Sequence, residues 1–330
     1  MRRVAALLAA ALLGAALSGC GGSGAEPGAP KGATLVLDFQ PNAVHSGIYA
    51  AQASGYFKDE GLDVAIREPS NPADSAKLLE SGRADFAVMD INDFGIARER
   101  GLDLIAIAAI VQRPLASVIA HDRNRISTPA DLAGKTVGVT GVPSDDAVLD
   151  SVLGSGGVDP SSVHRVTIGF NAVADLAAGK VDAATAFWNA EGVQLQQLGV
   201  PVREFRVDQF GAPRYPELVV ATTHRSCPIA HRFFAGLSRG YHTLGGDPAS
   251  ALDDLLSEVN GLDRALQQKE LEALVAANAF SGRAPEANTA ALQPGRARAW
   301  LDWATGHGLV AGFAAGRIAA GFQPAATDCD

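Results

Sequence analysis

The sequence predicts an α/β protein built from two lobes, and three observations support this prediction. The chain has 330 residues, whereas single hydrophobic cores stop growing near about 250 to 300 residues. Between Thr34 and Thr223, short runs of β-branched and apolar residues alternate with stretches of helical periodicity, which is typical of mostly parallel sheets. A set of residues with fixed spacing also occurs twice in the chain, as expected if each lobe contains a similar structural unit.

Ten segments have the composition of strands. They are 34–39, 62–68, 84–90, 103–111, 117–121, 136–140, 163–168, 183–187, 202–207 and 217–223. Helical periodicity is found between strands at 73–81 and 144–153. After the last strand only helical patterns remain, at 228–244, 247–259, 263–278 and 294–305. The C-terminal part of the chain is therefore expected to wrap around sheets that the earlier strands form.

The recurring set suggests where the two lobes face each other. Its members are Leu79, Gly82, Arg83, Asp85, Ala87, Asn92 and Gly95, followed by Leu176, Gly179, Lys180, Asp182, Ala184, Asn189 and Gly192. Each copy predicts a helix that ends at a glycine, a buried strand and a loop into the next helix. Chance similarity of two such units is the alternative. If the repeat is structural, the strand ends at 88–93 and 185–191 face one cleft, where open α/β sheets bind ligands.

The first 19 residues have the features of an export signal. Arg2 and Arg3 precede an apolar run at 4–17 that is too short to span a membrane comfortably. The following motif, LSGC at 17–20, resembles the lipobox of bacterial lipoproteins, in which Cys20 would carry the lipid. An ordinary signal peptide is the alternative. We therefore expect an exported protein that a lipid holds to the outer face of the cytoplasmic membrane.

Residues 20–33 consist mainly of Gly, Ser, Ala and Pro, and this composition predicts a flexible tether before a body that starts near Thr34. The whole chain has 27 basic and 36 acidic residues and a net charge of -9. Removal of residues 1–19 would leave 25 basic residues and a net charge of -11. Such an acidic protein is not expected to bind nucleic acid.

Cysteine and histidine spacing gives further expectations. With Cys20 lipidated, Cys227 and Cys329 remain as an even pair in an oxidising compartment and could form a disulfide, although two free thiols are the alternative. The seven histidines show no metal-ligand spacing, and the chain has no Walker motif or dinucleotide loop. We expect no metal and no cofactor, and any ATP hydrolysis would belong to a separate subunit.

One pattern could indicate an enzyme. The segment 236–240, GLSRG, has the spacing of a nucleophile elbow around Ser238, and Asp302 and His307 follow in the chain order of an α/β-hydrolase triad. An elbow requires a strand before the serine, but the apolar residues around Ser238 recur at helical spacing. A serine hydrolase is therefore the disfavoured alternative, and we do not expect an enzyme.

Two loops at predicted strand ends carry aromatic and amide side chains. They are DFQPNAVH at 38–45 and FWNAE at 187–191. Aromatic faces stack on flat heterocycles, and amide or carboxylate groups pair with their edges. The alternative interpretation is that Phe39 and Phe187 belong to the core, Asn42 forms a turn and Glu191 is solvated.

These loops lie within a wider family resemblance. The stretch 37–64, LDFQPNAVHSGIYAAQASGYFKDEGLDV, resembles the opening of the NMT1/THI5-like substrate-binding proteins of ABC importers. Further segments of similarity are 109–120, 127–142, 186–192 and 214–223, within a region of roughly 34–280. The resemblance implies a type II periplasmic-binding-protein-like fold, with two lobes, two crossover strands and a ligand in the cleft. Lobe 1 would comprise 34–118 plus 220–330, and lobe 2 would comprise 119–219.

The resemblance also implies a function and site residues. Known members bind pyrimidine precursors of thiamine, such as formylaminopyrimidine or hydroxymethylpyrimidine, and deliver them to an ABC permease with a separate ATPase subunit. We expect a monomeric receptor of this kind. Residues on the family's motifs are Asn42, His45, Trp188, Asn189, Glu191, Tyr215 and Glu217. Phe39 could stack on the ligand, Asp90 lies at the first predicted strand end, and Ser144 begins a helix where it could contact the ligand or serve as an N-cap.

One departure from the family keeps other ligands open. Pyrimidine binders often have Trp where this chain has Phe39. Relatives recognise riboflavin, and the wider superfamily binds taurine and alkanesulfonates. Riboflavin is therefore an alternative. A sulfonate is a weaker one, because it requires several anion donors and the nearest candidates are Arg113 and Arg214.

Overall fold

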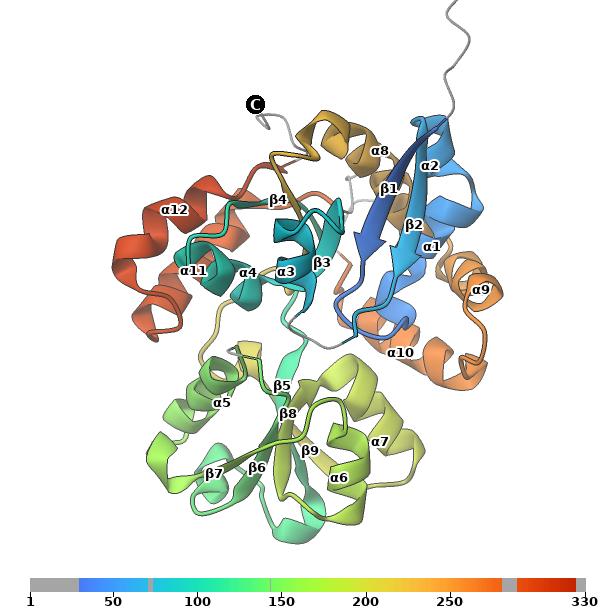
Figure 1. Cartoon of the computed structure of the whole chain (residues 1–330). Coiled ribbons are helices and arrows are strands. Elements are labelled where there is room, and N and C mark those ends of the chain that lie inside the picture. The colour runs from blue at the N-terminus through green and yellow to red at the C-terminus, as the bar shows by residue number, and fades with distance from the viewer. Residues whose placement is uncertain (1–29, 71–73, 143, 281–289, 325–330) are drawn as a thin grey trace, which may run out of the picture.

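Two five-stranded sheets organise the chain, one in each of two lobes (Figure 1). The computed structural model describes residues 30–70, 74–142, 144–280 and 290–324. The predicted export signal, Cys20 and Cys329 lie outside the described residues. Within the described residues, no helix is long and apolar enough to cross a membrane.

The sheet of the first lobe has the strand order β2-β1-β3-β10-β4. Its strands are β1 (Lys31–Val36), β2 (Leu62–Arg67), β3 (Phe86–Asp90), β4 (Leu104–Val111) and β10 (Leu218–Thr223). Strand β1 runs parallel to β2 and β3, and β10 runs antiparallel to β3 and β4. Two clusters of apolar side chains, one containing Phe86 and Phe233 and the other Phe94 and Trp300, form the core of this lobe.

The sheet of the second lobe repeats this arrangement in the order β7-β6-β8-β5-β9. Its strands are β5 (Ala116–His121), β6 (Thr136–Val139), β7 (His164–Thr167), β8 (Ala183–Phe187) and β9 (Val202–Arg206). Strand β6 is parallel to β7 and β8, and β5 is antiparallel to β8 and β9. Each of the ten predicted strands therefore corresponds to an observed strand.

Helices cover both sheets. In the first lobe they are α1 (Ser46–Ala53), α2 (Tyr56–Asp59), α3 (Asp74–Glu80), α4 (Ile91–Glu99), α8 (Cys227–Gly246), α9 (Pro248–Glu258), α10 (Arg264–Ala276), α11 (Pro294–Gly306) and α12 (Ala315–Ala320). In the second they are α5 (Ser144–Ser155), α6 (Ala172–Ala178), the π-helix η5 (Trp188–Gly192) and α7 (Val193–Gln197). Short 3₁₀-helices are η1 (Ala43–His45), η2 (Asp122–Asn124), η3 (Pro129–Leu132), η4 (Pro160–Ser162), η6 (Val207–Gln209) and η7 (Gly312–Ala314). The predicted C-terminal helices correspond to α8 to α11, and α10 also contacts η5 and α7 of the second lobe.

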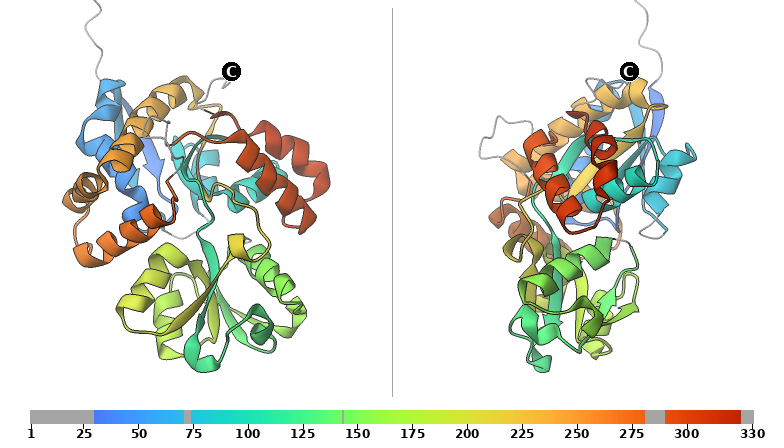
Figure 2. Two further views of the ribbon diagram at one scale, coloured as in Figure 1. Left: turned by 180° about the vertical axis from the view of Figure 1, so that it is seen from behind. Right: turned by 90° about the vertical axis from the view of Figure 1, so that its left-hand side faces the viewer.

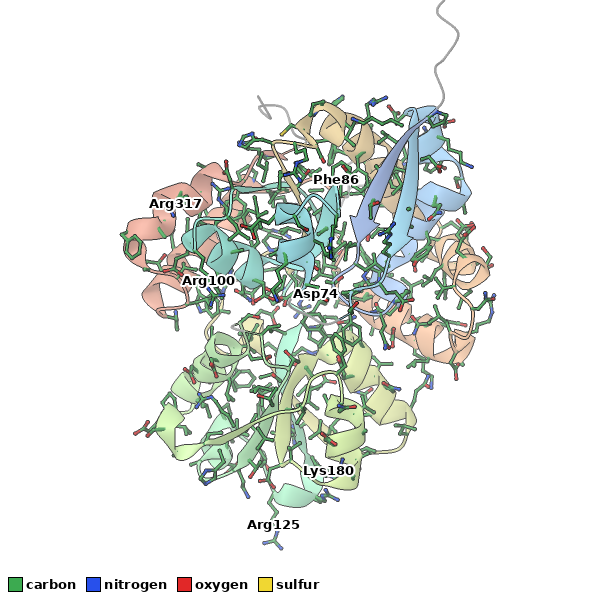
Figure 3. All side chains as sticks on the ribbon, in the orientation of Figure 1. Asp74, Phe86, Arg100, Arg125, Lys180 and Arg317 are labelled. Atoms are coloured by element: carbon green, nitrogen blue, oxygen red, sulfur yellow. The ribbon has the colours of Figure 1, made fainter. Side chains whose placement is uncertain are left out.

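Two crossovers connect the lobes, at 112–115 and 207–217, and both are visible from behind in Figure 2. The type II arrangement predicted from the family resemblance is therefore present. Strand β5 already begins at Ala116 and β10 at Leu218, so the sheets divide the chain slightly earlier than the expected boundaries at 119 and 220. Figure 3 shows Phe86 inside the first lobe, whereas Lys180 and Arg125 project from the far end of the second.

The first strand also begins earlier than predicted. Lys31 is already part of β1, where its backbone pairs with Leu62 and its N–H donates to the Gly61 carbonyl at 2.9 Å. The last three residues of the predicted tether therefore belong to the fold. Lys31 and Gly32 are exposed, so they give no apolar pattern from which a strand could be predicted. They belong to β1 because their backbones pair with β2.

The predicted internal repeat is structural. The Asp85 carboxylate accepts a hydrogen bond from the Thr34 amide at 2.8 Å, and the Asp85 amide donates to the Thr34 carbonyl at 2.9 Å. In the second lobe, Asp182 and Thr136 form the same two bonds, both at 2.9 Å. Each aspartate thus joins the start of one parallel strand to its neighbour, which explains why both copies of the repeat carry it.

Candidate functional site

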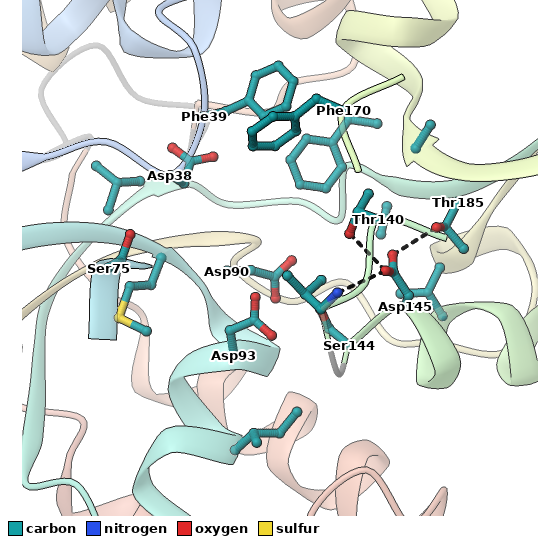
Figure 4. Close-up of a pocket in the computed structure, with 18 of the residues that line it drawn as sticks. Asp38, Phe39, Ser75, Asp90, Asp93, Thr140, Ser144, Asp145, Phe170 and Thr185 are labelled. Atoms are coloured by element: carbon teal, nitrogen blue, oxygen red, sulfur yellow. Dashed lines mark hydrogen bonds between the residues drawn. The ribbon is translucent and has the colours of Figure 1, made fainter. Parts of the chain in front are cut away.

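A cavity of about 200 Å³ lies between the lobes, and we call it the interlobe cavity (Figure 4). Its lining from the first lobe is Asp38, Phe39, Ser75, Ala76, Val88, Met89, Asp90, Asp93, Ile96, Ala97 and Arg100. Its lining from the second lobe, including β5, is Ala116, Ser117, Thr140, Val142, Ser144, Asp145, Val148, Phe170, Thr185, Ala186, Phe187 and Glu191. Both strand ends that the internal repeat indicated, 88–93 and 185–191, reach this cavity.

Two aromatic rings, one from each lobe, meet at one side of the interlobe cavity (Figure 4). Phe39 follows β1 and Phe170 follows β7, and their ring centroids are 4.6 Å apart with the planes perpendicular. Edge-to-face contacts of this kind are favourable because the positive ring edge meets the negative face. Each ring leaves part of its surface accessible, so the two rings offer an apolar contact to a flat ligand.

Asp145 organises the wall of the cavity in the second lobe. One of its carboxylate oxygens accepts hydrogen bonds from the Thr140 hydroxyl at 2.7 Å and from the Gly141 and Val142 amides at 2.8 and 3.2 Å. The other accepts from the Thr185 hydroxyl at 2.7 Å. Because these bonds occupy the carboxylate, Asp145 holds the loop after β6 against β8 rather than offering free acceptors to a ligand.

Asp90 and Asp93 line the cavity across from the aromatic rings, and Glu217 lies next to Asp90 outside the lining. Burial raises the pKa of Asp90 well above its ordinary value, and the neighbouring Glu217 carboxylate raises it further. Burial raises the pKa of Glu217 to about 7. Burial, and then the charge of Asp90, raise the pKa of Asp93 to about 8. These shifts favour the protonated forms, and a protonated carboxyl group can both donate and accept hydrogen bonds.

Glu191 extends the acidic lining into the second lobe. It lies in the π-helix η5 directly after β8, and one of its oxygens accepts a hydrogen bond from the Phe187 amide at 3.0 Å. Burial raises its pKa above the ordinary value. Because η5 begins directly after the last residue of β8, Glu191 stays close to the strand end and lines the cavity.

Four of the nine predicted ligand-binding residues line the cavity, namely Phe39, Asp90, Ser144 and Glu191. Asn42 and His45 instead shape the first loop. The Asn42 side chain accepts from the Val44 amide at 3.0 Å, and His45 accepts from the Asn42 amide through Nδ1 at 3.2 Å. His45 Nε2 lies 2.9 Å from an oxygen of Asp38, so the histidine orients a carboxylate that does line the cavity.

The other three predicted residues lie behind the cavity wall. The Trp188 indole N–H donates to the Pro114 carbonyl at 3.0 Å, and the Arg206 guanidinium lies 4.1 Å from the centre of its ring. Tyr215 is fully buried and stacks on Trp303, with ring centroids 5.8 Å apart. Asn189 is also fully buried, and neither atom of its amide has a hydrogen-bond partner among the described residues. Trp188 and Tyr215 therefore pack on the hinge side of the site, whereas the Asn189 amide is left without a partner there in the described part of the chain.

Several lining residues did not enter the sequence-based set. Asp38, Asp93 and Asp145 lie in segments that the sequence already singled out, and Asp38 and Asp145 adjoin the predicted residues Phe39 and Ser144. Phe170 lies two residues after the predicted strand at 163–168, and the rule that ligands lie beyond strand ends could have identified it. The approach of Phe170 to Phe39 depends on how the two lobes meet, which no local pattern encodes.

Ser238 does not form a nucleophile elbow. It lies in the middle of the 20-residue helix α8, so helix rather than a strand leads directly into it. The flanking Gly236 and Gly240 allow close packing, since a Cβ atom on Gly240 would lie 2.0 Å from the Gly47 carbonyl oxygen. Cys227, at the start of this helix, is disulfide-bonded. Its predicted partner, Cys329, lies outside the described residues, so the pairing stays a prediction.

Comparison with known proteins agrees with the two-lobed fold and its cleft. The alkanesulfonate-binding protein SsuA from Xanthomonas axonopodis pv. citri, solved bound to MOPS, has a TM-score of 0.67 at 18% identity, covering 89% of this chain and 99% of that one. At this identity the similarity concerns the fold, which is that of the two-lobed periplasmic binding proteins.

The chain belongs to the NMT1/THI5-like family, whose model matches residues 42–251. The formylaminopyrimidine-binding protein of Halalkalibacterium halodurans is 34% identical over 228 residues, which cover 68% of this chain and 69% of that protein. A 4-amino-5-hydroxymethyl-2-methylpyrimidine phosphate synthase of Legionella pneumophila is 29% identical over 176 residues. This second match covers 53% of the chain and 55% of the synthase.

Proposed function

We propose that this protein is an extracytoplasmic receptor that captures a pyrimidine precursor of thiamine, of the formylaminopyrimidine or hydroxymethylpyrimidine type, and delivers it to an ABC permease. The permease would be driven by a separate ATPase subunit. The observation that carries this proposal is the composition of the interlobe cavity, where two aromatic rings face carboxyl groups with raised pKa values. The similarity to a formylaminopyrimidine-binding protein supports the same ligand class.

The hydrogen-bonding edge of a 4-aminopyrimidine suits such carboxyl groups. That edge presents an amino donor next to a ring-nitrogen acceptor, and a protonated carboxyl accepts from the first and donates to the second. A buried carboxyl that loses such a partner is left unsatisfied, which costs about 1 to 3 kcal/mol. The cavity would therefore reject rings that lack the amine, while Phe39 and Phe170 contact the ring itself.

The same lining argues against a sulfonate. The cavity contains five carboxyl side chains, and Arg100 is the only cationic side chain among its described lining residues. Arg113 is bound to Asp208 at 2.8 Å, and Arg214 donates to the Asn278 carbonyl at 2.7 Å. A sulfonate would therefore find one cationic donor, Arg100, among the described lining residues, whereas sulfonate binding requires several anion donors.

The size of the cavity argues against riboflavin. Sites for drug-sized ligands enclose about 300 to 1,000 Å³, and this cavity, at about 200 Å³, suits a single ring better than a fused three-ring system with a sugar chain. We keep riboflavin in the binding test as the alternative ligand.

A receptor is favoured over a synthase for two reasons. The similarity to the binding protein covers more of the chain than the similarity to the synthase. The N-terminal sequence also carries the features of an export signal with a lipobox. We therefore place the protein outside the cytoplasmic membrane as a monomer that is anchored through a lipid on Cys20.

A thermal-shift panel tests the ligand assignment. The purified protein is heated with formylaminopyrimidine, 4-amino-5-hydroxymethyl-2-methylpyrimidine, riboflavin or taurine. A ligand at 100 times its dissociation constant adds about 2.7 kcal/mol of stability, so a pyrimidine should raise the melting temperature and be recovered unchanged after release. Glu191→Gln should weaken this shift, whereas the exposed control Glu272→Gln should not. A shift with taurine or riboflavin alone would refute the assignment.

Incorporation of a labelled fatty acid tests the anchor. The full-length protein expressed in a bacterium should incorporate the label, and Cys20→Ala should abolish incorporation. Equal labelling of both proteins would contradict anchoring through Cys20.

A further inference from the structure

Glu217 connects the hinge to the ligand cavity. It is the last residue of the second crossover and has no exposed surface. Its side chain accepts a hydrogen bond from the amide of Leu115, in the first crossover, at 2.9 Å. Its own carbonyl accepts from the amide of Ile91 at 2.9 Å. Glu217 thus joins both crossovers to the first turn of α4, directly beside Asp90.

The carboxyl groups of the half-buried Asp90 and the buried Glu217 are neighbours, because Asp90 pairs with Leu218 in the antiparallel register of β3 and β10 and the two side chains interact. Asp90 lines the cavity, and one of its oxygens accepts from the Asn92 amide at 2.6 Å. One oxygen of Glu217 has no partner among the described residues. Glu217 does not line the cavity, so its effect on a ligand would pass through Asp90.

The charged and titratable groups around the Asp90–Glu217 pair are mostly acidic. Asp38, from the loop after β1, and Asp93, in α4, face Asp90. Asp208 and Tyr215, from the second crossover, face Glu217. The guanidinium of Arg113, in the first crossover, is bound to Asp208 and to the Ala277 carbonyl at 2.8 and 3.1 Å. Two neighbouring carboxyl groups in such acidic surroundings oppose each other's ionisation.

We propose that Glu217 is a positioning residue of the ligand site, whose negative charge next to Asp90 keeps the proton on the Asp90 carboxyl, so that Asp90 can donate a hydrogen bond to a ring nitrogen. This inference rests on the proposed function, because it assigns the donor that an aminopyrimidine requires. The proton stays on Asp90 when the ligand binds, so no covalent bond breaks and no other reactant is involved. The amino group of the ligand donates to the second oxygen of Asp90.

The consequence is a characteristic dependence of affinity on pH. In the complex, one proton lies in the hydrogen bond between the Asp90 carboxyl and the ring nitrogen of the ligand. Above the pH at which the free pair loses that proton, affinity should fall about tenfold per pH unit. Glu217→Gln removes the neighbouring negative charge and keeps an acceptor for the Leu115 amide. It should therefore lower the pKa of Asp90 and start the fall at lower pH, with affinity near that of the unaltered protein in acid.

Isothermal titration with formylaminopyrimidine between pH 5 and 9 tests this role. The unaltered protein, Glu217→Gln and the exposed control Glu272→Gln are compared, and the control should match the unaltered protein. Any titration of the ligand itself affects all three proteins equally. A difference between proteins in the pH midpoint of the fall in affinity therefore comes from Asp90 and Glu217. Equal midpoints for Glu217→Gln and the unaltered protein would overturn the role of Glu217.

A second variant keeps the test decisive if Glu217→Gln does not fold. Asp90→Asn cannot lose a proton, so the fall in affinity attributed to the pair should disappear. Retention of the full pH dependence in this variant would overturn the proposal. Failure of the unaltered protein to bind either pyrimidine at any pH is a different result, which would contradict the proposed function itself.

Discussion

Carboxyl groups around the interlobe cavity differ in how many of their oxygens are already bonded. Asp145 receives four hydrogen bonds from its own lobe, whereas one oxygen of Asp93 has no partner among the described residues. A satisfied carboxylate contributes to the fold, and an unsatisfied one in a cavity is open to a ligand. The same residue type therefore has two roles, which its neighbours decide.

Asp145→Ala should destabilise the protein. The substitution leaves two amides and two hydroxyls without their acceptor, which should lower the free energy of unfolding by about 2 to 4 kcal/mol. Urea denaturation measures the change. The control Asp146→Ala removes an exposed carboxylate that pairs with Arg165 at 3.0 Å, and this should cost less than about 1 kcal/mol. Equal losses in the two variants would contradict a structural role for Asp145.

Phe170→Ala should weaken ligand binding more than it weakens the fold. Phe170 is only partly buried and contacts Phe39 of the other lobe at one side of the cavity, so loss of its ring removes an aromatic surface from the ligand. We expect affinity for a bound pyrimidine to fall by about tenfold, corresponding to about 1.4 kcal/mol. Calorimetric titration measures this. Phe313→Ala, which removes a side chain that is 85% exposed, should leave affinity unchanged, and a similar loss there would contradict a specific role for Phe170.

At the level of elements, glycines set the distance between α1 and α8. A Cβ atom on Gly47 would lie 2.7 Å from the ring of Tyr241, and one on Gly240 would lie 2.7 Å from the Cβ atom of Ala51. The Tyr241 hydroxyl donates to the Val44 carbonyl at 2.8 Å, which ties α8 to the loop that carries Asp38 and Phe39. The GLSRG segment thus serves close helix packing, and its spacing resembles a hydrolase motif only by chance.

Gly240→Ala should destabilise this helix pair. The added methyl would meet backbone atoms of α1, which cannot rotate away as a side chain can, so we expect a loss of about 1 to 3 kcal/mol. Thermal denaturation measures the loss. Gly246→Ala adds a methyl in the same helix where nothing lies within 4 Å, and it should be neutral or slightly stabilising. Equal melting temperatures for the two variants would contradict the packing argument.

The positions of strands and helices along the chain could be predicted from the sequence better than the contacts between them. Ten strands were predicted because β-branched runs and glycine-terminated helices are local signals. The helix α10 was also predicted, but its contact with η5 and α7 of the other lobe was not. That contact joins residues far apart in the chain, and the surface pattern of a helix does not identify its partner.

For the molecule as a whole, buried acids link stability to pH. Besides Asp93 and Glu217, burial raises the pKa of Glu270 in α10 to about 8. Unfolded carboxyls lose their protons near pH 4, whereas these groups keep them in the fold until about pH 7 to 8. Between these values the unfolded state binds fewer protons. The free energy of unfolding should therefore fall as pH rises from about 5 to 8.

Glu270→Gln should reduce this dependence. Each such group contributes at most about 1.4 kcal/mol per pH unit, and the variant removes one of them without touching the cavity lining. Urea denaturation at several pH values between 5 and 8 measures the slope. The control Glu272→Gln changes an exposed residue of the same helix and should keep the original slope. An unchanged slope in Glu270→Gln would show that Glu270 ionises normally in the fold.

The sequence by itself determined the α/β class, the order of the strands along the chain, the internal repeat and the family. These properties depend on local periodicity and on motifs that persist within short segments. Tertiary structure decided which candidate residues reach the cavity. Trp188 and Glu191 are three residues apart, yet Trp188 packs under Arg206 while Glu191 lines the cavity. Burial and distant neighbours also set the pKa values of Asp90 and Glu217, because desolvation and electrostatic interactions depend on distances in space rather than positions in the chain.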